Sequence, residues 1–248
     1  DLLDAGYDKF TAPMYGGFDG LNITEKEPFR NTGLSDKTQE TSYAYNTIKR
    51  AIDTVADPEF VETNIMTVPG ITNSILTKHL VDTCEKRGDS LAIIDIENDF
   101  IPFTENTADI TARLPSVSSA ITSLKTRSIN SSYGCCFFPF VQVRDTRTGR
   151  LIDVPPSVPA LGTFGSSQAR TEVWFAPAGF VRGGLSGGAA GIPVTNVKLR
   201  LTSKDRDKLY AVNINPIASF PSEGIVIFGQ KTLQVQRSAL DRINVRRL

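Results

Sequence analysis

Hydrophobic and polar positions follow a helical period in the first well-patterned part of the chain. Between residues 41 and 55, hydrophobic side chains recur three and four positions apart, which places them on one face of a helix. Because the residue before a proline disfavours the α conformation, Asp57 and Pro58 are expected to end this helix. The hydrophobic positions are Tyr45, Ile48, Ala51, Ile52 and Val55.

The following stretch predicts a strand, a helix and a second strand. Residues 61–68 and 91–96 are dominated by hydrophobic positions, and residues 74–87 between them have helical spacing. This order and these lengths are typical of a right-handed parallel βαβ crossover. The residues expected to delimit the helix are Thr72 or Asn73 as its N-cap and Gly88 as its C-terminal stop.

The middle of the chain predicts a helical region, a strand, a hairpin and a further helix. Pro115 interrupts a helical region that begins at Thr107 or Asp109, and regular spacing resumes after it. Residues 132–144 have the most hydrophobic strand pattern of the chain, in which Pro139 indicates a bulge or a sheet edge. The other expected elements are a helix over residues 116–125, a hairpin over residues 145–153 that turns at Thr148 and Gly149, and a small-residue helix over residues 160–171.

The last part of the chain predicts short strands next to turns. Residues 197–202 alternate as a strand, and Ser203 is the expected N-cap of the next helix. Because proline has no N–H group, we expect Pro216 and Pro221 to bar regular pairing on either side of residues 217–220. The remaining expected elements are a strand buried on both faces at residues 225–228 and a helix over residues 239–248 with Ser238 as its N-cap.

This alternation of strands and helices predicts an α/β fold. We expect a mixed, largely parallel central sheet flanked by helices, preceded by a loop-rich N-terminal segment. The strands that define the sheet are expected at residues 61–68, 91–96, 135–143 and 225–228.

Composition changes this picture only by exclusion. The 248 residues include 27 Lys and Arg and 27 Asp and Glu, so the net charge is zero, and 40% of the residues are hydrophobic. A neutral chain is not expected to bind nucleic acid through bulk charge. No hydrophobic run approaches the roughly 18 residues needed to span a bilayer, so membrane insertion is not expected either.

The cysteines predict buried thiols in a reducing compartment and no metal site. The chain has three cysteines, and Cys135 and Cys136 are adjacent in a predicted strand, so their side chains point to opposite faces. Vicinal cysteines rarely form a structural disulfide, and no C-x-x-C pattern is present for zinc.

Carboxylates at one strand end are the main candidate for chemistry. Asp95, Glu97 and Asp99 follow the predicted strand 91–96, and ligands of open α/β sheets bind beyond the carboxyl ends of strands. These residues could form the site of a metal-dependent hydrolase. No histidine or cysteine lies nearby in sequence, so a solvated loop is the favoured interpretation.

Two glycine-rich segments resemble catalytic or phosphate-binding motifs only superficially. Residues 184–188 fit the G-x-S-x-G pattern around Ser186. The single histidine, His79, precedes this serine, and no hydrophobic strand leads into the motif, so a flexible loop is expected. Residues 16–20 lack the lysine of a phosphate loop and predict a tight turn. We therefore expect no catalytic, cofactor-binding or metal-binding residues, and no enzyme activity.

Several motifs, in order along the chain, together resemble tail sheath proteins of contractile-tailed bacteriophages. The C-terminal part reads N-P-I at residues 215–217, a Phe-Pro turn, a hydrophobic strand that ends at Gly229, K-T-L at residues 231–233 and N-V-R-R-L at residues 244–248. The upstream motifs are the G-G-x-D-G turn formed by Gly16, Gly17, Asp19 and Gly20, then V-P-G, C-E-K-R-G-D, T-G-R, V-P-P-S and W-F-A-P-A at residues 174–178.

This resemblance implies a structural protein of the virion. Sheath subunits stack as rings around a tail tube and rearrange on contraction, which drives the tube through the host envelope. The implied partners are other copies of the sheath protein, the tail tube protein and the baseplate, and synthesis is expected in the host cytoplasm. A carbohydrate- or receptor-binding module is the third class considered, but it predicts an exposed aromatic cluster, whereas most aromatics fall in predicted core strands.

The resemblance also predicts the domain organisation. Residues 1–37 are expected to form an entry segment, and residues 38–248 the sheath core. Relatives carry an N-terminal arm and a C-terminal domain that exchange strands between neighbours, and this chain is expected to lack both. We therefore expect the chain alone to be soluble and largely monomeric. The glycine-rich loop at residues 183–191 departs from the family pattern and has no predicted role.

Overall fold

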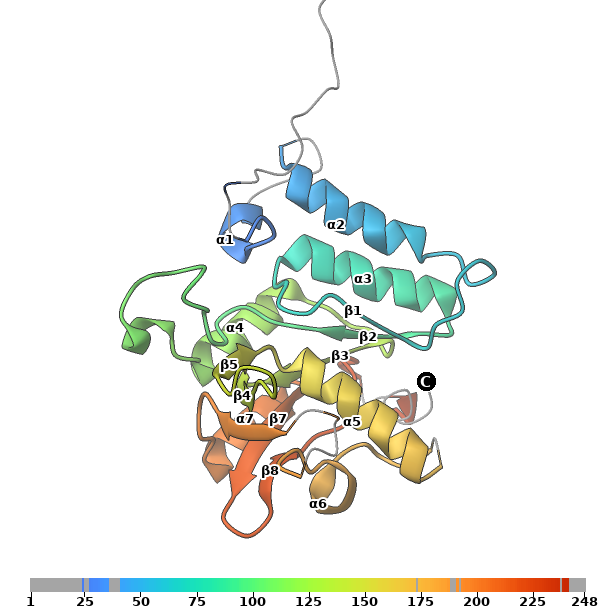
Figure 1. Cartoon of the computed structure of the whole chain (residues 1–248). Helices are drawn as coiled ribbons and strands as arrows, with labels where there is room; N and C mark the ends of the chain where they lie inside the picture. Colours follow the sequence, from blue (N-terminus) through green and yellow to red (C-terminus); the bar gives the residue numbers. More distant parts are fainter. Residues whose placement is uncertain are drawn as a thin grey trace, which may run out of the picture.

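A computed structural model describes residues 24, 27–35, 41–172, 174–187, 191, 193–236 and 238–240. These residues form two sheets with helices packed around them (Figure 1). The predicted turn at residues 16–20 lies outside the described residues, as does nearly all of the predicted helix at residues 239–248.

The main sheet has five strands in the order β1-β2-β3-β7-β8. The first four strands are parallel, and the last is antiparallel to its neighbour. This confirms the predicted mixed, largely parallel sheet. The strands are β1 (Ile65–Thr67), β2 (Leu91–Ile94), β3 (Gly134–Phe138), β7 (Ile214–Phe220) and β8 (Gly224–Ile227).

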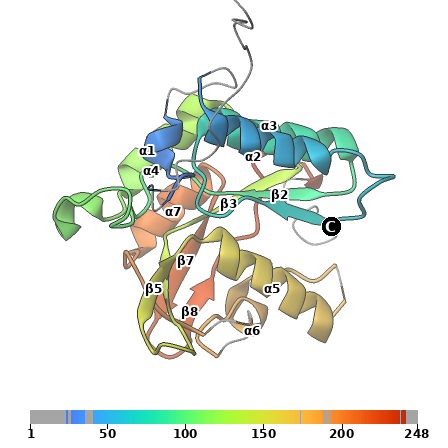
Figure 2. The same ribbon diagram turned by 45° about the horizontal axis from the view of Figure 1, so that its top comes forward.

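Helices cover both faces of this sheet, as Figures 1 and 2 show from two directions. On one face α3 packs on the sheet and α2 packs on α3, with α4 and α7 beside them. On the other face α5 contacts β2 and β3. The helices are α2 (Tyr43–Thr54), α3 (Ser74–Arg87), α4 (Val117–Arg127), α5 (Ser157–Arg170) and α7 (Ser203–Ala211); the shorter turns are α1 (Asn31–Leu34), η1 (Ile110–Arg113) and α6 (Gly179–Arg182).

The two faces of the central strands belong to two separate hydrophobic cores. Cys136 and Phe138 point into the core beneath α2 and α3, whereas Cys135 and Phe137 point into the core shared with α5 and the second sheet. This alternation follows from the two-residue period of a strand. It confirms that the adjacent cysteines face opposite sides, and all three cysteines of the chain are buried free thiols.

The helix of the predicted βαβ unit, α3, has the predicted ends. The side chain of Asn73 accepts hydrogen bonds from the backbone N–H groups of Ile75 and Leu76, so Asn73 is the N-cap of α3. At the other end Gly88 has a φ of 74°, a left-handed conformation that glycine adopts without the strain of a Cβ atom. The expected C-terminal stop is therefore confirmed.

The predicted strand at residues 132–144 is wrong as a single element, because it divides between two sheets. β3 ends at Phe138, and the chain then enters β4 (Val141–Arg144) of a three-stranded antiparallel sheet. Pro139 lies between the two strands and has no N–H group to continue the ladder. The order of the second sheet is β5-β4-β6, with β5 (Leu151–Val154) and β6 (Val194–Val197).

Other strand boundaries also differ from the predictions. The strand expected at residues 61–68 is shorter, because side chains hold its first part: Arg87 donates to the carbonyl of Val61, and Ser90 donates to the carbonyl of Thr63. The strand expected at residues 197–202 is placed wrongly. β6 ends at Val197, and the residues after it form the connection to α7, which begins at Ser203.

Two predictions about local chemistry in the C-terminal part are also wrong. Thr202, not Ser203, caps α7, because its side chain and that of Asp205 form a reciprocal capping box. Pro216 does not bar pairing but lies within β7. The ladder with β3 ends at this residue, and its carbonyl accepts a hydrogen bond from the N–H of Phe228.

Candidate functional site

The predicted acidic group lies at the carboxyl ends of the parallel strands, as expected, but its favoured interpretation as a solvated loop is wrong for Asp95 and Asp99, which are both buried. All three residues follow β2. Glu97 and Asp99 line a cavity of about 840 Å³, and Asp95 binds the N–H of Gly70 in the wall of this cavity. The segment after β1 and the residues around α1 also line this cavity. The position therefore fits a ligand site of an α/β sheet, and the contacts of each carboxylate decide whether it can act as one.

Asp95 is fully committed to backbone and hydroxyl donors. One carboxylate oxygen accepts from the N–H of Gly70, at 2.8 Å, and from the hydroxyl of Ser157, at 2.7 Å; the other accepts from the N–H of Ser157, at 3.2 Å. Burial raises the pKa of Asp95 to about 6, against the opposing effect of these hydrogen bonds. The side chain thus joins the end of β2 to the turn after β1 and to the first turn of α5.

Asp99 is also buried but only half satisfied. Its Oδ1 atom accepts from the N–H groups of Phe100 and Phe140, at 2.8 and 2.9 Å. Its Oδ2 atom is buried and has no hydrogen-bond partner. Burial raises the pKa of Asp99 to about 8, so this carboxyl group is mostly protonated at neutral pH.

Glu97 points away from the two buried aspartates toward α4. It forms an ion pair with Arg127, at 3.5 Å, and accepts a hydrogen bond from Ser123. The three carboxylates therefore serve three different sets of partners. In the part of the chain that the structure describes, no group of three or more His, Cys, Asp or Glu side chains could hold a metal ion. Nothing in this geometry supports the metal-dependent hydrolase.

The protonation of Asp99 predicts a dependence of stability on pH. A carboxyl group whose pKa is higher in the folded state than in the unfolded state stabilises the fold at low pH, and this stabilisation is lost as the pH rises toward the folded-state pKa. Between pH 6 and 8, we expect the free energy of unfolding of the wild type to fall by roughly 1 kcal/mol per pH unit relative to Asp99→Asn. Urea unfolding across this range measures the difference.

The matched control for this prediction is Asp145→Asn. Asp145 is half-buried in a turn, and the hydrogen bond from the hydroxyl of Thr148 lowers its pKa, so its contribution changes only in acid. Asp145→Asn should therefore run parallel to the wild type between pH 6 and 8. If Asp99→Asn also ran parallel, the carboxyl group of Asp99 would be ionised in the folded protein at neutral pH.

The G-x-S-x-G segment has a structural role at Ser186. The hydroxyl of Ser186 accepts a hydrogen bond from the N–H of Ile225, at 2.8 Å, and Gly184 forms a bridge with Val226. This segment therefore pairs with the free side of β8. The single histidine, His79, lies on α3 and pairs instead with Asp53 of α2, at 2.6 Å. The serine and the histidine serve different elements, and residues 188–190 of the loop lie outside the described residues.

Exposed aromatic side chains are the feature that sequence analysis missed. Phe180, Phe220 and Phe228 contact one another with ring centroids 5.0 to 5.6 Å apart, and the guanidinium of Arg206 lies 5.1 Å from the ring centroid of Phe220. We call these four residues the aromatic–arginine cluster. Phe180 is 48% exposed and Phe228 is 41% exposed. The expectation that strand 225–228 is buried on both faces is therefore wrong at its last residue, Phe228. The sequence of this strand does not indicate that α6 lies beside it.

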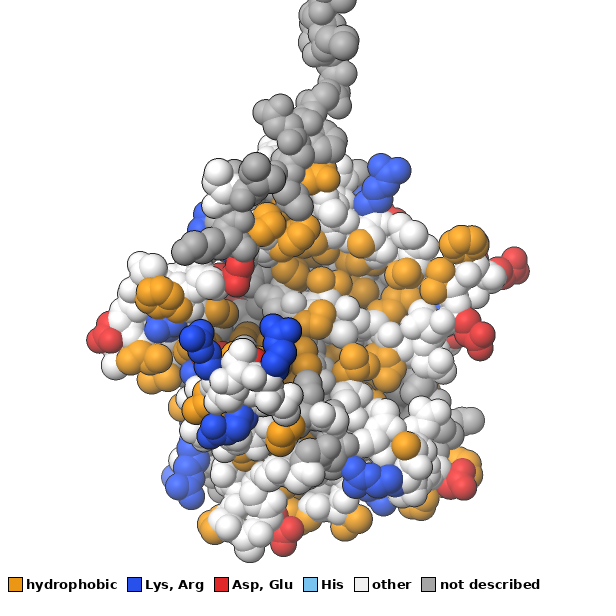
Figure 3. Space-filling view, in the orientation of Figure 1, with side chains coloured by type: hydrophobic (Ala, Val, Ile, Leu, Met, Phe, Trp, Pro, Cys, Tyr) orange, Lys and Arg blue, Asp and Glu red, His pale blue; other side chains and the backbone are white. Residues whose placement is uncertain are grey.

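A hydrophobic surface also borders the edge strand β1. A hollow of about 370 Å³ lies between β1 and the C-terminal half of α2. In Figure 3 hydrophobic side chains reach the surface over this region of the molecule. The residues that line the hollow include Ile52, Val55, Val61, Ile65, Met66, Val68 and Leu80. No helix in the described part of the chain is long and hydrophobic enough to cross a membrane.

Comparison with known proteins connects this fold and sequence to contractile tails. No family model matches the chain. A tail sheath protein of Vibrio phage KVP40 is 44% identical over 78 residues, which are 32% of this chain and 11% of that protein. A tail sheath protein of Enterobacteria phage T4 is 35% identical over 100 residues, which are 39% of this chain and 14% of that protein.

Solved structures share the fold at lower sequence identity. The helical sheath of the anti-feeding prophage in its contracted state has a TM-score of 0.54 at 20% identity and covers 85% of this chain and 49% of that chain. The contracted sheath complex of an extracellular contractile injection system has a TM-score of 0.53 at 15% identity and covers 79% of this chain and 47% of that chain.

A third structure, the baseplate of the anti-feeding prophage, has a TM-score of 0.55 at 18% identity and covers 80% of this chain and 45% of that chain. The aligned part of this chain thus spans about half of these solved chains, and a smaller share of the phage relatives. The resemblance to contractile tail sheath proteins that the motifs predict is confirmed, both in sequence segments and in the fold.

Proposed function

We propose that this chain is the α/β core of a contractile tail sheath subunit. The observation that carries this proposal is the 44% identity over 78 residues to a phage tail sheath protein. The fold supports it, because the similarity to a contracted sheath subunit extends over 85% of the chain. In this function the subunits polymerise as stacked rings around a tail tube, and their rearrangement drives the tube through the host envelope.

The packing suits a subunit that moves as a rigid body. The buried side chain of Asp95 joins the turn after β1 to the first turn of α5, so it links elements on the two faces of the sheet. A sheath shortens when packed subunits slide or rotate against one another, and such motions keep each subunit rigid. A core whose elements are held together by buried contacts can slide or rotate as a unit without deforming.

The proposal extends to partners and domain organisation. We propose that residues 1–37 serve as an entry segment and residues 38–248 as the sheath core, and that strand exchange links neighbouring subunits in the assembled sheath. β1 is an edge strand of the main sheet and offers an open side to an added strand. The partners are further sheath subunits, the tail tube protein and the baseplate. The protein acts in the virion after synthesis in the host cytoplasm, and it has no enzymatic role.

Negative-stain electron microscopy tests the proposal. We expect the 248-residue chain to remain as separate particles, because its aligned part spans only about half of the solved sheath chain. A longer form that carries the flanking N- and C-terminal segments of the Vibrio phage relative is expected to form striated tubes, with the intact relative as the positive control. If the relative formed tubes and the extended chain did not assemble at any salt or protein concentration, the sheath function would be contradicted.

A further inference from the structure

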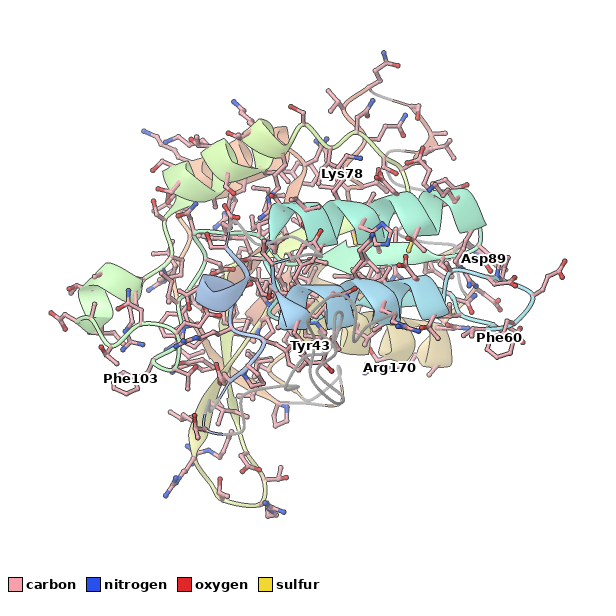
Figure 4. The ribbon with its side chains drawn as sticks, turned by 90° about the horizontal axis from the view of Figure 1, so that it is seen from above. Tyr43, Phe60, Lys78, Asp89, Phe103 and Arg170 are labelled. Atoms are coloured by element: carbon pink, nitrogen blue, oxygen red, sulfur yellow. The ribbon has the colours of Figure 1, made fainter. Side chains whose placement is uncertain are left out.

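The loop between α2 and β1 presents an exposed aromatic side chain among carboxylates. Phe60 is 80% exposed, and Asp57, Glu59 and Glu62 around it are exposed as well. We call these four residues the acidic loop. In Figure 4 Phe60 projects from one end of the molecule. Within the described residues, none of its three carboxylates forms an ion pair.

A buried guanidinium holds the acidic loop in place. The side chain of Arg87 donates to the carbonyls of Val55 and Val61, at 2.7 and 2.9 Å, so one cation fixes both ends of the loop. Arg87 is itself oriented by two hydrogen bonds to Asp89, and its side chain is completely buried. A preorganised loop loses little conformational entropy when it binds. An exposed phenylalanine on such a loop is therefore suited to act as an anchor in an interface.

The aromatic–arginine cluster is complementary to the acidic loop in charge, and both present exposed aromatic rings. Its three rings leave edges and faces exposed, and aromatic rings pack favourably against a further ring. Arg206 forms no ion pair within the described part of the chain, and neither does Arg182, which lies over Phe175 nearby. One carboxylate, Glu223, lies in the turn between β7 and β8.

We propose that the acidic loop of one subunit docks on the aromatic–arginine cluster of a second copy of this chain. Phe60 packs against the rings of Phe180 and Phe228, and the carboxylates of Glu59 and Glu62 face the guanidinium groups of Arg182 and Arg206. The inference rests on the proposed sheath function and names one contact through which its subunits meet. Two different surfaces of the same chain form this contact, so it is heterologous and repeats from subunit to subunit.

Site-specific crosslinking tests this contact in the full 248-residue chain. The three native cysteines are buried, so a maleimide crosslinker will report on introduced thiols. Ala56→Cys places a thiol beside the acidic loop, and Val181→Cys places one on α6 at a position that is 86% exposed. Because the crosslinker traps a contact that is too weak to hold the separate chains together, we expect a mixture of the two variants to give covalent dimers at far higher yield than either variant alone. A variant with both cysteines should give a ladder of longer species.

Matched phenylalanine variants identify the anchor. Phe60→Ala is expected to lower the crosslinking yield of the mixture at least about tenfold. Phe103→Ala is the control, because Phe103 is also an exposed phenylalanine but lies at the opposite end of the molecule in Figure 4. It should leave the yield unchanged. Both positions are exposed, so neither substitution is expected to prevent folding.

Three outcomes overturn the inference. They are a mixture that crosslinks no better than a surface control with Lys125→Cys, a single-cysteine variant that crosslinks as well as the mixture, and equal effects of Phe60→Ala and Phe103→Ala. The first outcome includes the case in which a different partner occupies the cluster. If the extended protein with Phe60→Ala still formed striated tubes, the proposed contact would be contradicted and the sheath function would stand. If the chain crosslinked specifically but the extended protein formed no tubes, the sheath function would be contradicted and the contact would stand.

Discussion

Replacing Asp95 with alanine is expected to lower the free energy of unfolding by about 3–5 kcal/mol. The substitution leaves the N–H group of Gly70 and both the N–H and the hydroxyl of Ser157 without their buried acceptor. Each buried donor that loses its partner costs about 1–3 kcal/mol. Urea denaturation followed by circular dichroism at neutral pH measures the loss.

Glu97→Ala is the control for this prediction. Glu97 belongs to the same acidic segment, but its side chain is 49% exposed and its ion pair with Arg127 is long. The Arg127 side chain is only 4% exposed, but it keeps its hydrogen bonds to Thr77 and to the carbonyl of Thr72 when Glu97 is removed, so we expect a smaller loss of about 1–2 kcal/mol. If the two substitutions had equal effects, Asp95 would not join the three elements around it, and the interpretation of this strand end as a structural junction would be wrong.

The junction at Asp95 also shows how much of the fold local sequence patterns predict. The sequence of residues 73–96 marks the ends of its own elements, because a capping asparagine, a C-terminal glycine and an uninterrupted hydrophobic run are all local signals. The structure follows them in α3 and β2. The roles of the carboxylates were harder to predict, because the donors that bind Asp95 are 25 and 62 residues away in sequence.

The predictions failed where pairing between distant segments decides the structure. Residues 197–202 alternate like a strand, but β4 pairs with β6 (Val194–Val197). Pro216 was expected to end pairing, yet β7 lies between two partners that use different parts of the strand. The aromatic–arginine cluster was missed for the same reason, since its members come from α6, α7 and the β7–β8 hairpin. The sequence pattern of each element, taken separately, does not indicate that the three elements lie side by side.

Asn215→Asp is expected to destabilise the fold by more than about 4 kcal/mol, because Asn215 joins the last described segment to the central sheet. Its amide group donates to the carbonyls of Cys136 and Lys231, at 3.0 and 2.8 Å, while its Oδ1 atom accepts from the N–H of Lys231, at 2.7 Å. The side chain is completely buried. An aspartate here would direct a carboxylate oxygen at two carbonyl oxygens and would bury a charge. The loss measured by urea denaturation should be larger at pH 8 than at pH 4, where protonation removes the charge.

Asn213→Asp provides the comparison within the same segment. Asn213 is half-buried and makes one side-chain hydrogen bond, to the carbonyl of Gln234. Its replacement removes one donor at a site that water can reach, so we expect a loss of about 1–2 kcal/mol. Gly229 lies so close to Asn215 that a Cβ atom on it would be 2.7 Å from the Oδ1 atom, which shows how tightly this site is closed. Equal losses for the two substitutions would mean that the segment after β8 is held by its backbone alone, and that the buried amide of Asn215 does not anchor it.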